Sequence, residues 1–223
     1  MRATIKTSNA LAILAAVLLC VAAPASAGPF LITVDTSPLS GTQTLAFALT
    51  NSDPASNTVL LSDFNFGGGN AVTATQDCTL GGTFSGLGCS GDLATSVDLQ
   101  DLDVVGFFTQ QFNPGASLSF VLTATNNFVG SVPDQFAMFL CDATVTTCYS
   151  DDPSTGAMLL LDMAGGILSS SSFVVFGAGS QELRAPQVRA APAVPEPTTA
   201  LLLGSGVAYF LTRPPHRRRR RRA

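Results

Sequence analysis

The carboxylates are the residues of this chain with the greatest capacity for chemistry. Residues 28–183 carry thirteen aspartates and Glu182, but no lysine, arginine or histidine, and the single histidine of the chain is His216. This composition excludes from residues 28–183 a Ser–His–Asp or Cys–His nucleophile, a lysine Schiff base and a metal hydrolase built on histidine ligands. We therefore expect that the protein is not an enzyme and that it has no catalytic residue.

Two groups of aspartates lie close together in the sequence. Asp98, Asp101 and Asp103 form one group, and Asp151 and Asp152 form the other. Neither group follows the EF-hand loop, which needs oxygen ligands at set positions and a terminal glutamate. We expect these side chains to be solvated loop aspartates, and their spacing predicts no metal site.

The charge of residues 28–183 is strongly negative. Their formal charge is −14, whereas the whole chain has −4, because every basic residue lies before or after this range. Such a surface repels nucleic acid, so no nucleic-acid partner is expected. The charge has two interpretations: it keeps an exported domain soluble, or it attracts divalent cations, such as calcium, or cationic polymers.

Four cysteines lie in the same range: Cys78, Cys89, Cys141 and Cys148. Four cysteines allow three pairings, and the spacing favours two local disulfides, Cys78–Cys89 and Cys141–Cys148. Disulfides are typical of an oxidising compartment. The alternative is a metal site, but the C-x-x-C pairs of a zinc site are missing and no histidine is nearby.

Residues 1–27 have the three parts of a secretory signal peptide. Two basic residues come first, an apolar run follows over 11–23, and Ala25 and Ala27 supply the small side chains of a cleavage site. The apolar run is too short to span a bilayer comfortably. We expect export of the chain and cleavage after Ala27.

Residues 28–180 show short apolar runs separated by glycine, proline, asparagine and aspartate. Leu45, Phe47 and Leu49 alternate with other residues at the period of two that indicates a half-buried strand. Eight to ten short strands predict an all-β fold, an antiparallel β-sandwich that is jelly-roll-like. The strands are expected at 31–34, 44–50, 58–66, 71–75, 96–99, 104–112, 117–125, 135–141, 158–161 and 167–176. Residues 181–194, rich in alanine, proline, glutamine and arginine, are expected to form an extended linker.

Residues 195–223 have three parts in a fixed order. Pro195, Glu196 and Pro197 come first, and an almost wholly apolar segment follows at 199–211. A run of six arginines then forms a cytoplasmic stop, because arginine crosses a bilayer at a cost of roughly 2.5–3.5 kcal/mol per residue. These arginines are Arg217, Arg218, Arg219, Arg220, Arg221 and Arg222. With the signal peptide, this order predicts a short transmembrane helix that leaves residues 28–194 outside the cytoplasm.

This arrangement resembles the PEP-CTERM sorting signal of Gram-negative bacteria. The resemblance covers about thirty residues and rests on the Pro-Glu-Pro motif, the apolar segment and the arginine cluster. It implies that an exosortase recognises Pro195, Glu196 and Pro197 and cleaves the chain near them. It also implies an inner-membrane intermediate, followed by release to the cell surface or the extracellular polymer. The alternative is an ordinary single-pass anchor in which the motif is part of a linker.

Two functions are compatible with these features. The first is an exported surface or extracellular-matrix protein with a structural role, sorted by an exosortase and associated with exopolysaccharide. The second is a calcium-stabilised module that binds glycans or partner proteins, which the uncompensated negative charge favours. No other cofactor is expected.

Overall fold

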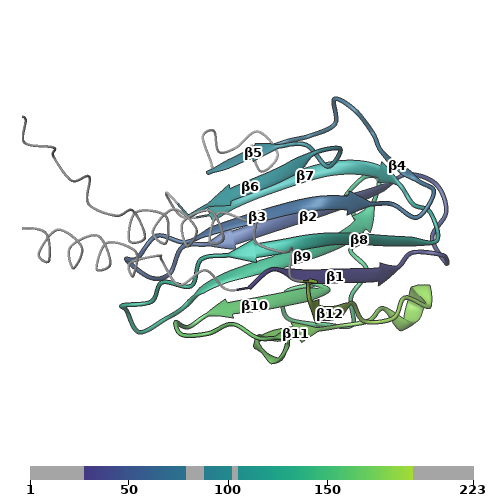
Figure 1. The fold of residues 1–223 in the computed structure, drawn as a ribbon. Helices are drawn as coiled ribbons and strands as arrows, with labels where there is room; N and C mark the ends of the chain where they lie inside the picture. The colour runs from purple at the N-terminus through teal and green to yellow at the C-terminus, as the bar shows by residue number, and fades with distance from the viewer. Residues whose placement is uncertain (1–27, 79–87, 102–104, 193–223) are drawn as a thin grey trace, which may run out of the picture. The chain divides into compact units, whose positions relative to one another are not determined.

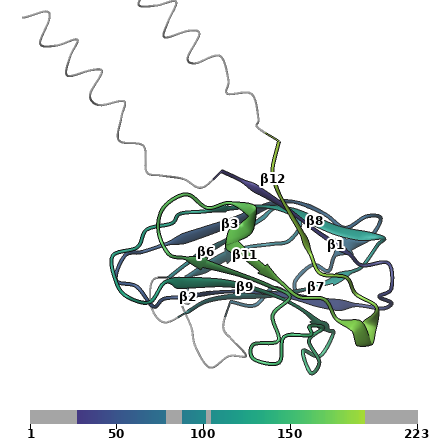
Figure 2. The same cartoon turned by 90° about the horizontal axis from the view of Figure 1, so that it is seen from below.

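The computed structural model describes residues 28–78, 88–101 and 105–192, and these residues form a β-sandwich of two antiparallel six-stranded sheets (Figures 1 and 2). The strand order is β12-β1-β8-β3-β6-β5 in one sheet and β11-β10-β9-β2-β7-β4 in the other. The prediction of an all-β fold with two antiparallel sheets is confirmed.

Each sheet combines long central strands with short strands at its edges. The first contains β12 (Gln187–Ala190), β1 (Phe30–Asp35), β8 (Ser117–Ala124), β3 (Thr58–Asn65), β6 (Ser96–Gln100) and β5 (Cys89–Gly91). The second contains β11 (Phe173–Val175), β10 (Leu159–Met163), β9 (Asp134–Asp142), β2 (Gln43–Thr50), β7 (Val105–Asn113) and β4 (Asn70–Ala71). Two short 3₁₀ helices lie at Ser170–Ser172 (η1) and Gly179–Gln181 (η2).

Phenylalanines fill the space between the sheets. Phe47 on β2 lies at the centre, with its ring centroid 5.6 Å from that of Phe120 on β8 in the opposite sheet. Phe108 and Phe136, from the two strands that flank β2, place their ring centroids 6.3 and 6.0 Å from that of Phe47. All four side chains are fully buried. Burial of each contributes about 1.5–3 kcal/mol, so the alternating phenylalanines are a main source of the stability of the sandwich.

The observed strands differ from the predicted ones mainly at the edges of the sheets. The regions predicted at 71–75 and 167–176 form strands only at Asn70–Ala71 and Phe173–Val175. Strands β5 and β12 were not expected, because neither has an alternating apolar pattern.

Strand β12 lies within the range predicted to be a linker. It pairs antiparallel with β1, from Phe30 opposite Ala190 to Thr33 opposite Gln187. The Ala191 N–H also donates to the Pro29 carbonyl at 2.7 Å. The sandwich therefore extends past the boundary expected at residue 180, and its first and last strands are neighbours.

Candidate functional site

The residues predicted to direct processing lie outside the part of the chain that the structure describes. They are Ala25 and Ala27 of the signal cleavage site, the Pro195, Glu196 and Pro197 motif, and the arginines 217–222. The apolar segment at 199–211 is outside it as well. Within residues 28–78, 88–101 and 105–192, no helix has the length and apolar character needed to cross a membrane.

Both predicted disulfides are present. Cys78–Cys89 joins the segment after β4 to strand β5, with 5.7 Å between the Cα atoms. Cys141–Cys148 joins the end of β9 to the chain seven residues further on. The pairing is the one that the cysteine spacing predicted, and the two disulfides indicate an oxidising compartment outside the cytoplasm.

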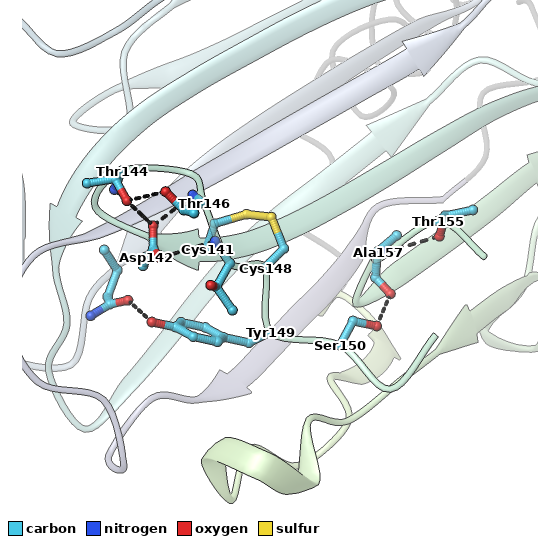
Figure 3. Close-up of a disulfide and its surroundings, with 11 residues drawn as sticks. Cys141, Asp142, Thr144, Thr146, Cys148, Tyr149, Ser150, Thr155 and Ala157 are labelled. Atoms are coloured by element: carbon cyan, nitrogen blue, oxygen red, sulfur yellow. Dashed lines mark hydrogen bonds between the residues drawn. A yellow bond between two sulfur atoms is a disulfide. The ribbon is translucent and has the colours of Figure 1, made fainter. Parts of the chain in front are cut away.

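The Cys141–Cys148 disulfide closes a small hairpin (Figure 3). The Asp142 N–H donates to the Thr147 carbonyl at 2.9 Å, and the Tyr149 N–H donates to the Leu140 carbonyl at 2.7 Å. Cys141 is fully buried, and the Tyr149 hydroxyl donates to Oε1 of Gln43 at 3.0 Å. The hairpin is thus fixed to β2 as well as to β9, and the Tyr149 hydroxyl is engaged within the protein.

Hydroxyl and backbone donors surround the loop aspartates. In the hairpin, the Thr144 hydroxyl donates to Asp142 at 2.8 Å, and the Thr146 N–H donates to the same carboxylate (Figure 3). These two hydrogen bonds lower the pKa of Asp142. In the next loop, the hydroxyls of Ser154 and Thr155 lower the pKa of Asp152 to about 2. These carboxylates are stabilised as anions by local donors, without any cationic side chain.

The prediction of solvated loop aspartates is wrong for Asp101 and Asp152, which are 1% and 7% exposed. Asp152 turns back to accept hydrogen bonds from its own loop. Asp101 belongs to a buried polar network at one end of the sandwich. Asp98 is half-buried on β6, and Asp103 lies outside the described residues.

The buried network joins three connections between strands. Its members are Asp53 and Asn57 from the β2–β3 connection, Asp101 after β6 and Asp134 at the start of β9, and none is more than 2% exposed. We call these four residues the buried carboxylate network, and we call the end of the sandwich at which they lie the loop end.

Asn57 is the centre of the buried carboxylate network. Its backbone N–H donates to Oδ2 of Asp101 at 2.6 Å, and its side-chain Nδ2 donates to Oδ2 of Asp134 at 2.7 Å. Its Oδ1 accepts from the Thr125 hydroxyl at 3.1 Å and from the Asn127 N–H at 2.8 Å. One asparagine therefore bonds both carboxylates and also holds the β8–β9 connection.

Asp53 and Asp134 are well supplied with donors. Oδ1 of Asp134 accepts the N–H groups of Ser52 and Asp53 at 2.6 and 2.7 Å. Burial by itself raises the pKa of Asp134, but the Asn57 amide and these two N–H groups outweigh it and hold the pKa below its ordinary value. The Asp53 carboxylate accepts from the N–H groups of Ala55, Val129 and Gly130.

Asp101 is less well supplied. Among the described residues no donor reaches its buried Oδ1, whereas its Oδ2 accepts the Asn57 N–H. Burial raises the pKa of Asp101 to about 6, against the effect of the Asn57 N–H, and the neighbouring Asp134 carboxylate raises it further. With the pKa of Asp101 raised and that of Asp134 lowered, Asp101 is the carboxyl of this pair that protonates first as the pH falls.

Two cavities of the described residues, of about 140 and 280 Å³, are lined by residues outside the network, including Asp35 and Arg184 in the first and Phe173 and Val188 in the second. In the described ranges, no set of three or more histidine, cysteine, aspartate or glutamate side chains is arranged to hold a metal ion. The arrangement can bind a proton and fix loops.

Sequence reasoning missed Asn57 and Asp134, although the alternation contains a signal for both. Asn57 precedes the inward-facing Val59 and Leu61 at a spacing of two, and Asp134 precedes Phe136 in the same way. Asp101 likewise follows Val97 and Leu99 on the buried face. Each polar residue continues the inward face of its strand by one step.

Comparison with known proteins gives no further assignment. No family model, no curated protein and no solved structure matches this chain. Function must therefore be inferred from the residues and from the geometry of the sandwich.

Proposed function

We propose that the protein is an exported surface or extracellular-matrix component that an exosortase processes at Pro195, Glu196 and Pro197. The observation that carries the proposal is the order of motif, apolar segment and arginine cluster in residues 195–223, in a chain that begins with a signal-peptide pattern. In this scheme the inner membrane holds the chain transiently, and the sandwich is released outside the cell.

Two features of the sandwich support export and a structural role. The disulfides suit an oxidising compartment, and the hydroxyl-capped aspartates give a soluble domain of strong negative charge. We infer association with exopolysaccharide through polar contacts rather than ring stacking. Tyr149, the only tyrosine of residues 28–183, uses its hydroxyl within the protein, and the range has no tryptophan.

The strand order supports the jelly-roll-like part of the fold prediction. The run β1-β8-β3-β6 in one sheet and β2-β7-β4 in the other is the interleaved order that two wound Greek keys produce. Ala191, whose N–H donates to the Pro29 carbonyl, lies four positions before Pro195 in the sequence.

The chain offers a matched pair of substitutions to test processing, because Glu182 and Glu196 are its only glutamates. The wild type, Glu196→Gln and Glu182→Gln would be expressed in a Gram-negative host that has an exosortase. Mass spectrometry of the mature C-terminus and cell fractionation would follow. We expect wild type and Glu182→Gln to lose the arginine run and leave the inner membrane, and Glu196→Gln to retain both the run and the membrane location.

The competing interpretation is an ordinary single-pass anchor. It predicts that all three chains keep residues 217–222 and remain in the inner membrane. That result would overturn the sorting proposal while leaving the fold and the disulfides unaffected.

A further inference from the structure

The buried carboxylate network fastens three loops that are far apart in the sequence. The Asn57 N–H and the Asp101 Oδ2 join the β2–β3 connection to the end of β6, and the Asp101 N–H returns a bond to the Asn57 carbonyl at 3.3 Å. Asp134 receives the Asn57 side chain and the N–H groups of Ser52 and Asp53. A change in the charge of Asp101 or Asp134 therefore affects the hydrogen bonds that hold all three connections.

The charges around this pair are all negative. Among the described residues, Asp53 is the other carboxylate in the network. Asp98 on β6 alternates with the buried Val97 and Leu99, so its side chain points to the opposite face of the sheet. Asp63 lies on β3, six residues beyond Asn57. Residues 28–183 contain no lysine, arginine or histidine that could neutralise two adjacent carboxylates.

A proton on Asp101 removes the repulsion between the two carboxylates, whereas a metal ion would need further ligands. Asp134 already accepts three N–H groups, so its oxygens are held as acceptors, whereas Oδ1 of Asp101 is buried without a donor. A protonated Asp101 carboxyl supplies one O–H donor, which matches one acceptor on its neighbour. In the described residues, no third histidine, cysteine, aspartate or glutamate completes a metal site here.

We propose that Asp101 and Asp134 form a proton-binding latch, in which Asp101 donates a hydrogen bond to the Asp134 carboxylate and thereby locks the loop end of the sandwich at mildly acidic pH. Ionisation of Asp101 leaves two buried anions side by side and loosens the connections that they hold. The latch is independent of the sorting proposal, because it concerns only the folded domain.

The direction of the pH dependence follows from the raised pKa. Asp101 has a pKa of about 6 in the folded chain, whereas an unfolded aspartate has a pKa of about 3.9. The folded state thus binds the proton more tightly, so the stabilisation is present at low pH and is lost as the pH rises through 6. These two values predict that the folding equilibrium constant falls about tenfold between about pH 5 and pH 8.

The test compares the purified mature wild type with Asp101→Asn and Asp63→Asn in urea unfolding over the range from about pH 5 to pH 8, at constant ionic strength with a chelator. An asparagine side chain in place of Asp101 keeps an acceptor for the Asn57 N–H and presents a permanent donor to Asp134. We expect the tenfold fall in wild type and in the exposed Asp63→Asn control, and no fall in Asp101→Asn. A wild-type slope that persists in Asp101→Asn would overturn the latch.

A second measurement keeps the proposal testable if the variant does not fold. Amide hydrogen exchange of wild type would be followed at Ser52, Asp53 and Asn57, whose N–H groups bond the two carboxylates. After correction for intrinsic rates, we expect their protection to decrease above about pH 6, while amides in the β2–β7 pairing keep theirs. Unchanged protection at all three would refute the latch. Protection that increases when calcium chloride is added but does not change with pH would also refute it and would identify a cation as the ligand.

Discussion

Replacement of Asn57 by alanine is the most direct test of the buried carboxylate network. The side chain of Asn57 is fully buried and takes part in four hydrogen bonds. Alanine removes all four and leaves Oδ2 of Asp134 without its donor, in a place that water does not reach in the folded chain. The backbone of Asn127 also loses both of its bonds to this side chain.

The expected loss is large relative to the stability of a domain. A buried polar group left without its partner costs about 1–3 kcal/mol, and a charged group costs more. With the Asp134 carboxylate and the Asn127 backbone affected together, Asn57→Ala should lower the free energy of unfolding by about 3–5 kcal/mol. Single domains commonly have only about 5–15 kcal/mol in total, so the variant should be marginally stable.

Asn127→Ala is the matched control, because Asn127 lies beside the network but is exposed and donates its side-chain amide to the Ser56 carbonyl at 2.9 Å. Urea unfolding at mildly acidic pH, followed by far-UV circular dichroism, would compare both variants with wild type. The control should lose less than about 1 kcal/mol. A loss for Asn57→Ala within about 1 kcal/mol of the control would refute the reasoning that this asparagine holds the loop end together.

Two further predictions concern the edges of the fold. Replacing Cys141 and Cys148 by serine should destabilise the oxidised protein by about 2–3 kcal/mol, measured by thermal unfolding, and a reducing agent should abolish the difference from wild type. Ending the chain after Pro186 removes β12 and leaves the edge of β1 unpaired, so self-association should increase with concentration in analytical ultracentrifugation; a monomer as stable as the full mature chain would contradict this.

The central strands were predictable because they obey a simple period. Phe108 and Phe120 lie on strands in which buried and half-buried residues alternate strictly, whereas Phe47 and Phe136 lie on strands that are buried on both faces over part of their length. All four were expected to be strand and core, because apolar residues alternate along the sequence of each strand. The edge strands were not predictable in this way. Strand β12 has the sequence QVRA with no buried residue, and it is held by backbone pairing to β1, which depends on the completed sheet.

The carboxylate network was predictable in part. The alternation that places Val59, Leu99 and Phe136 inside also points Asn57, Asp101 and Asp134 inward. Asn57 and Asp101 lie one residue outside their strands, and Asp134 is the first residue of β9. Which of these side chains meet is decided by the order of strands in both sheets, and the sequence alone does not provide that order. The prediction that Asp101 is solvated was wrong because Asp101 follows Val97 and Leu99 at a spacing of two, which places it on the buried face, although other aspartates lie close to it in the sequence.

The absence of lysine and arginine from residues 28–183 raises the question of how so many carboxylates are accommodated, and two different solutions are visible. Asp142 and Asp152 accept several hydroxyl and N–H donors from their own loops, so each is stable as an anion and its pKa is lowered. This solution works wherever the chain can turn back on its own aspartate. At the loop end of the sandwich the donors are engaged by Asp53 and Asp134, and Asp101 is left with one oxygen unsatisfied. Residues 28–183 offer no cationic side chain to complete the network, so a proton from solvent takes that place, and for that reason the stability of the domain should depend on mildly acidic pH.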